Sequence, residues 1–96
     1  KGSLMSIQWL FDVIESRKQS PSEKSYTSSL FTEGLPKIAQ KVGEEGTEVV
    51  VAALAQDDQR LIEEVADLTY HTLVLLAARG LKPEDVLAEL EKRHNR

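Results

Sequence analysis

The stretch that decides the fold runs over residues 36–80 and reads "PKIAQKVGEEGTEVVVAALAQDDQRLIEEVADLTYHTLVLLAARG". The polar segment "QDDQ" divides it into two runs with helical apolar periodicity. Either aspartate of that segment can cap the start of a helix, and Gly80 can end one. We therefore predict one helix over about 35–55 and another over about 58–79. Their very short connection favours an antiparallel hairpin.

Three shorter helices are predicted around this hairpin. The first covers 6–17 with Ser6 as its N-cap, and a short one within "YTSSLFTEG", 26–34, ends at Gly34. The last covers 83–93, because proline is well tolerated at the first helical position. The expected buried stripe of the first helix is Ile7, Leu10, Phe11 and Ile14. The fold class predicted is all-α, a four- to five-helix antiparallel bundle completed by dimerisation.

Composition limits the class of protein. The 96 residues suffice for one domain over 6–96, and residues 1–5 are interpreted as an N-terminal tail or cloning remnant. The absence of cysteine excludes a disulfide framework and a thiolate metal site. No apolar run approaches the roughly 18 residues of a membrane span. A net charge of −4 without a basic face argues against nucleic acid. We expect a cytoplasmic protein that binds neither membrane nor nucleic acid.

Acidic residues are concentrated in two segments of the hairpin, "KVGEEGTEVV" at 41–50 and "EEVADLTYH" at 63–71. Five carboxylates in these segments account for the acidity, because the net charge of the chain is −4 and would be positive without them. The acidity is therefore a local feature. They are Glu44, Glu45, Glu48, Glu64 and Asp67.

Helical geometry places these acids on one side of each helix, since a helix turns about 100° per residue. On the first helix of the hairpin, a sector roughly 100° wide holds Lys37, Lys41, Glu44, Glu45, Glu48 and Ala52. An apolar stripe lies beside it, formed by Leu35, Ile38, Val42, Val49 and Ala53. On the second helix one narrow face holds Arg60, Glu64, Asp67 and His71. The packing there is expected mostly from Leu61, Val65, Leu68 and Leu76. Antiparallel pairing can then bring both acidic faces to one cleft.

Two interpretations of this acidity stay open. A solvated surface is the simpler one, because runs of charge usually face water. Four carboxylates converging at about 4–5 Å would instead repel one another by a few kcal/mol each, which a divalent cation removes. Oxygen ligands without thiolate suit Mg²⁺, with Mn²⁺ as a substitute. A di-iron bundle needs a Glu-x-x-His pair on each of two helices, and the two histidines, His71 and His94, are not so placed.

The segments "GEEGTE" and "EVADLTYH" resemble the signature of the all-α MazG-like nucleoside-triphosphate pyrophosphohydrolases, E-E-x-x-E followed by E-x-x-D on the next helix. Within that group the chain is most similar to the phosphoribosyl-ATP pyrophosphohydrolase family of histidine biosynthesis. "SYTSSLFTEG" at 25–34, "KIAQKVGEEGTEVVVAAL" at 37–54 and "EEVADLTYHTLVLLAARG" at 63–80 carry this similarity. It extends over about 25–94.

The resemblance implies Mg²⁺-dependent hydrolysis of phosphoribosyl-ATP to phosphoribosyl-AMP and pyrophosphate by a homodimer. Carried over by position, the implied metal ligands are Glu45, Glu48, Glu64 and Asp67. Glu44 joins Glu45 and Glu48 as a catalytic carboxylate that orients water or assists a general base. The candidate substrate contacts are Lys37, Lys41, Tyr26, Thr27, Tyr70 and His71. Pairing of Lys41 with Glu44 or Glu45, and exposure of Lys37 to solvent, explain the lysines at least as well. Tyr70 and His71 are more often packing residues.

Two other functions remain open. One is a MazG-like hydrolase of ordinary or damaged nucleoside triphosphates. The other is a non-catalytic helical dimerisation module whose acidic face binds a basic partner.

Overall fold

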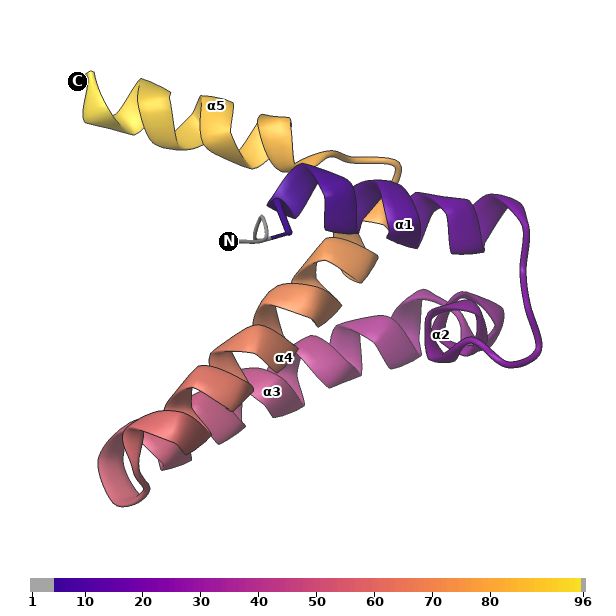
Figure 1. The fold of residues 1–96 in the computed structure, drawn as a ribbon. Helices are drawn as coiled ribbons and strands as arrows, with labels where there is room; N and C mark the ends of the chain where they lie inside the picture. Colours follow the sequence, from indigo (N-terminus) through magenta and orange to yellow (C-terminus); the bar gives the residue numbers. More distant parts are fainter. Residues whose placement is uncertain (1–4, 96) are drawn as a thin grey trace.

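The structure is a computed structural model that describes residues 5–95, so the tail expected over 1–5 lies outside the described residues apart from Met5. Helices make up the fold, and the described residues contain no strand (Figure 1). The all-α prediction is confirmed, and every helix lies within two residues of its expected bounds. The helices are α1 (Ile7–Gln19), α2 (Tyr26–Glu33), α3 (Leu35–Ala55), α4 (Asp58–Ala78) and α5 (Pro83–His94).

Local signals explain where the helices begin and end. The hydroxyl of Ser6 accepts a hydrogen bond from the backbone of Trp9, and the carboxylate of Asp57 accepts one from the backbone of Arg60. Two glycines follow helices in the left-handed region, Gly34 with φ 97° and Gly80 with φ 72°. Residues with a side chain rarely adopt these angles, so both glycines stop the helix before them.

Helices α3 and α4 lie side by side as an antiparallel hairpin, and α1 crosses the C-terminal half of α4 (Figure 1). α2 packs between α1 and the start of α3. The core lies where these helices meet, near the end of α4. Its buried members are Phe11, Ile14, Leu30, Ile38, Leu73, Val74 and Ala77.

The packing predicted for α4 was wrong, because its buried apolar residues are Leu73, Val74 and Ala77, and none of the four expected residues is fully buried. Val65, expected in the core, is 43% exposed, whereas Glu64 and His71 are buried. The polar face of α4 is therefore the face that meets α3 and α2. Because α4 carries apolar residues on several sides, its composition alone did not decide which side faces inward. In α1, Ile7 likewise lies outside the core and is 49% exposed.

The fold is open rather than compact. Helix α5 extends away from the hairpin, and only Pro83 at its start is buried (Figure 1). The radius of gyration is 14.7 Å, against about 13 Å for a compact domain of 100 residues. Among the described residues, no helix combines the length and the apolar character needed to cross a membrane.

Candidate functional site

Three of the predicted metal ligands converge between α3 and α4. Glu45 on α3 and Glu64 and Asp67 on α4 each offer a carboxylate oxygen, and these oxygens lie within 4.8 Å of one another. The three side chains differ in burial, because Glu64 is buried, Glu45 half-buried and Asp67 exposed. A hard oxygen donor set of this kind, open to solvent on one side, fits Mg²⁺ or Mn²⁺, which keep several waters when bound.

Glu64 is the ligand candidate with the most constrained environment. Burial raises its pKa above the usual 4.5, and the neighbouring carboxylates Asp67, Glu45 and Glu48 raise it further, while Arg60 opposes them. The protein therefore holds an acid where a negative charge is disfavoured. A bound dication would remove that penalty.

The other two predicted carboxylates lie at the edge of this group. Glu48 is exposed and is not one of the three converging residues, yet its charge still acts on Glu64. Glu44 is also exposed and accepts a hydrogen bond from the Gln40 amide at 2.8 Å. That bond, helped by Lys41, lowers the pKa of Glu44 below 4.5, so this carboxylate stays ionised.

Basic side chains flank the acids on both helices. On α3, the Lys41 ammonium lies 3.4 Å from Glu44 and 3.7 Å from Glu45. Burial works against its charge, but Tyr26, Glu44 and Glu45 outweigh burial and raise the pKa of Lys41. On α4, the Arg60 guanidinium bridges two glutamates, at 2.6 Å from Glu63 and 2.7 Å from Glu64. Lys37 is half-buried, and its charge acts on Glu44.

Sequence reasoning placed Arg60 on the acidic face but gave it no role. The signal that could have revealed its contact is the spacing Arg60 to Glu64, since residues four apart on a helix are neighbours.

Four candidate substrate contacts form a polar network between α2 and α4, next to Asp67. His71 Nδ1 lies 2.8 Å from the backbone carbonyl of Asp67, and its Nε2 lies 3.0 Å from the Tyr26 hydroxyl. A carbonyl can only accept, so Nδ1 donates, and in the neutral ring Nε2 accepts from Tyr26. Tyr70 and Thr27 hydrogen-bond through their hydroxyl groups, and the rings of Tyr26 and Tyr70 stack at 6.2 Å. The network thus ties α2 to the helix that bears two of the acids.

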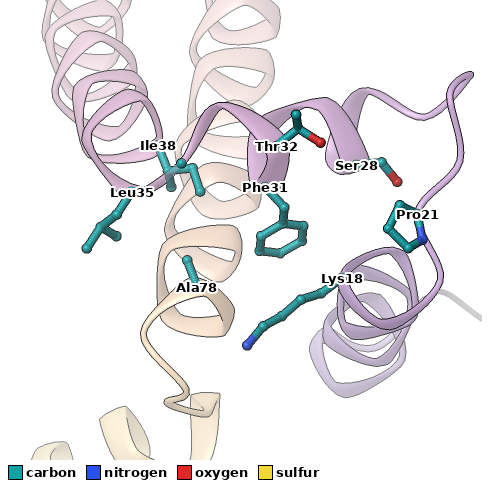
Figure 2. A pocket seen from close by; sticks show the side chains of 9 residues that line it. Lys18, Pro21, Ser28, Phe31, Thr32, Leu35, Ile38 and Ala78 are labelled. Atoms are coloured by element: carbon teal, nitrogen blue, oxygen red, sulfur yellow. The ribbon is translucent and has the colours of Figure 1, made fainter.

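A cavity of about 390 Å³ lies elsewhere, between α1, α2 and the C-terminal end of α4. Figure 2 shows Lys18 reaching across it toward α4, where its ammonium donates to the carbonyl of Ala77 at 2.7 Å. None of the predicted site residues lines this cavity. The acidic cluster, rather than the cavity, is therefore the candidate site.

Comparison with known proteins gives a consistent result. A model of the family described as phosphoribosyl-ATP pyrophosphohydrolase matches residues 8–94. Proteins named phosphoribosyl-ATP pyrophosphatase resemble the chain closely. One from Clostridium botulinum is 51% identical over 90 residues, covering 94% of this chain and 82% of that protein.

Two further relatives with the same name come from distant organisms. The protein from Lacticaseibacillus casei is 52% identical over 91 residues, covering 95% of this chain and 83% of its own length. The protein from the archaeon Sulfurisphaera tokodaii is 52% identical over 84 residues, covering 88% of this chain and 89% of its own length. The match to the family and these identities support one conclusion: the chain belongs to the phosphoribosyl-ATP pyrophosphohydrolase family of hydrolases.

Proposed function

We propose that this protein hydrolyses phosphoribosyl-ATP to phosphoribosyl-AMP and pyrophosphate in a Mg²⁺-dependent reaction, the second step of histidine biosynthesis, in the cytoplasm. The observation that carries the proposal is the convergence of Glu45, Glu64 and Asp67, with oxygens within 4.8 Å of one another, in a chain of this family. Three acids drawn together without a counter-ion would repel one another, so the arrangement favours a cation-binding role over a purely solvated surface.

Glu45, Glu64 and Asp67 are assigned as ligands, with Glu48 beside them. Mg²⁺ held there supplies charge neutralisation on the phosphate oxygens and acidifies water. The helical hairpin supplies rigidity, because the ligands project from two packed helices rather than from loops. Water attacks the α- or β-phosphorus, the phosphoanhydride bond between these two breaks, and phosphoribosyl-AMP and pyrophosphate share the oxygen and protons of that water as products.

Glu44 and the lysines of α3 act on substrate and water. Glu44 remains an ionised acceptor at neutral pH, which suits a carboxylate that orients water. The raised pKa of Lys41 keeps its ammonium charged beside the acids, and Lys37 precedes it by about one turn. Both are assigned to phosphate oxygens. Tyr26, Thr27, Tyr70 and His71 are assigned to the wall of the site, where they orient α2.

The protein is proposed to act as a homodimer. Its accessible surface is 6883 Å², against about 5500 Å² for a compact protein of 10.7 kDa. The excess is of the size that one partner buries in an obligate homodimer. Apolar side chains are exposed on α3, α4 and α5, among them Val50, Leu54, Ile62, Val65, Leu87 and Leu90.

The test is release of pyrophosphate from phosphoribosyl-ATP and from a panel of nucleoside triphosphates, with and without Mg²⁺. The proposal expects phosphoribosyl-ATP to be strongly preferred and turnover to stop when Mg²⁺ is chelated. A preference for deoxynucleoside triphosphates would instead identify a MazG-like hydrolase of wider scope. No pyrophosphate from any substrate, with no Mg²⁺-dependent rise in Tm, would favour the non-catalytic dimerisation module.

A further inference from the structure

Arg60 lies against Glu64, the buried member of the three converging acids. Its Nη2 lies 2.7 Å from Glu64 Oε2, while its Nη1 lies 2.6 Å from Glu63 Oε1. We infer that Arg60 is the internal counter-cation of the metal-free protein, and that binding of a divalent ion displaces its guanidinium from Glu64. This inference rests on the metal site proposed above.

Glu64 needs a counter-cation when no metal is bound. Its side chain is only 8% exposed, and the oxygens of Glu45 and Asp67 converge on it. Leaving one charge unpaired in such a place is strongly unfavourable, because burial removes the water that would otherwise solvate it. The guanidinium meets this need from the solvent side, since the Arg60 side chain is 47% exposed.

The same contact obstructs metal binding. A dication on Glu64 would lie within a few ångströms of the guanidinium, and the two positive charges would repel. Mg²⁺ also requires near-ideal octahedral geometry with several waters, which demands space around the carboxylate. The two cations therefore compete for one acid.

Displacement leaves Arg60 with a partner. Glu63 is 46% exposed, is not one of the three converging acids, and already holds the other nitrogen of the guanidinium. Lys41, the cation on the opposite side, lies 3.7 Å from Glu45 and 3.4 Å from Glu44. Arg60 is thus the cation in direct hydrogen-bond contact with the buried ligand.

The decisive measurement is the Kd for Mg²⁺ alone by isothermal titration calorimetry, on wild type and Arg60→Gln. Loss of a charge-assisted hydrogen bond that competes with the metal is expected to tighten Mg²⁺ binding by about tenfold. The Tm of the variant without Mg²⁺ should fall, because Glu64 loses its partner, and Mg²⁺ should raise its Tm more than that of wild type. Arg93→Gln is the matched control, since it breaks an ion pair of 3.0 Å with Glu89 on α5 and changes the net charge equally. Its Kd should equal that of wild type.

Two further measurements distinguish direct competition at Glu64 from a general effect of the positive charge of Arg60. Arg60→Lys keeps the charge, but one ammonium cannot bridge both glutamates in the same way. The Kd of this variant for Mg²⁺ should therefore lie between those of wild type and Arg60→Gln. The gain in Arg60→Gln should persist at high ionic strength, where more distant exposed charges are screened. A gain that disappears in high salt would overturn direct competition.

The outcomes also distinguish this inference from the proposed metal site. Equal or weaker Mg²⁺ binding by Arg60→Gln, with wild type binding normally, overturns the role of Arg60 alone. Absence of Mg²⁺ binding in both proteins overturns the metal site and the inference together. Binding by Arg60→Gln but not by wild type supports both.

Discussion

Glu64 shows how one residue can be unfavourable for folding and useful for binding. Most glutamates lie in water, yet this one is buried on the inner face of a hairpin, beside two other carboxylates. Its raised pKa records the resulting penalty on the charged form. The proposed cation would relieve this penalty, because its charge is opposite to that of the three carboxylates.

The pH dependence of stability tests this account. A folded-state pKa above 4.5 means that Glu64 favours folding at low pH, and that this contribution is lost as the pH rises through the raised value. Without Mg²⁺, Glu64→Gln should therefore be at least as stable as wild type at pH 7, and its advantage should disappear below pH 4.5. Thermal unfolding of both proteins from pH 7 to below pH 4.5 measures this difference in stability. With Mg²⁺, the rise in Tm expected for wild type should be absent. A variant that is less stable at pH 7 and still responds to Mg²⁺ contradicts the assignment.

Glu48 tests the catalytic assignment. Glu48→Gln keeps the shape of the side chain but removes one charge from the edge of the cluster. It should remove most turnover, with a loss of about 100-fold in kcat/KM. Stability without Mg²⁺ should be kept or raised, since a repulsion is removed. The matched control is Glu84→Gln, an exposed glutamate on α5, which should keep full activity. Wild-type turnover in Glu48→Gln would show that the role given to Glu48 is wrong.

At the scale of the helices, α2 is held on α4 by hydrogen bonds from two of its first residues. The Tyr26 hydroxyl lies 3.0 Å from His71 Nε2, and Thr27 binds the hydroxyl of Tyr70. His71 in turn bonds the backbone of Asp67. The orientation of α2 is thereby coupled to the part of α4 that carries Glu64 and Asp67, the proposed ligands.

Tyr26→Phe should lower the free energy of unfolding by about 1 kcal/mol, because the buried ring nitrogen of His71 loses its donor. Chemical denaturation measures this change. If Tyr26 serves only to position α2, the KM for phosphoribosyl-ATP should stay close to that of wild type. Glu33→Gln, at the exposed end of α2, is the control and should change both quantities little. A large rise in KM without loss of stability would make Tyr26 a substrate contact instead.

The helices were predictable because their ends are marked by single residues with strong preferences. Ser6 and Asp57 cap helices, Gly34 and Gly80 follow them, and Pro83 begins one. The site was predictable in part, since helical spacing alone placed the acids on two faces. The rotation of α4 about its own axis could not be predicted, because apolar residues surround much of the helix. Val65, expected to pack, is therefore exposed, whereas Glu64 lies with Glu45 and Asp67, where the acidic faces were expected to converge.

At the scale of the whole molecule, the chain exposes more surface than a compact protein of its mass. Helix α5 stands away from the hairpin, and apolar side chains remain uncovered on both. A single copy thus leaves much of its apolar surface in water, which association can bury.

Light scattering after size-exclusion chromatography should give a mass of about twice 10.7 kDa. Val65→Lys, on the outer side of α4, should shift this mass toward that of one chain at low concentration. A buried lysine would place an unpaired charge in the interface. Gln59→Lys adds the same charge at an exposed position of α4 and should leave the dimer intact. A wild-type mass of 10.7 kDa at all concentrations would contradict dimerisation.

The two-residue connection between α3 and α4 has a consequence for the order of folding. It keeps Glu45 and Asp67 close along the chain, so bringing them together requires closure of only a short loop. Local contacts of this kind form fast, whereas the docking of α1 on α4 joins distant parts of the chain. The acids should accordingly meet early, while the rest of the chain is still collapsing.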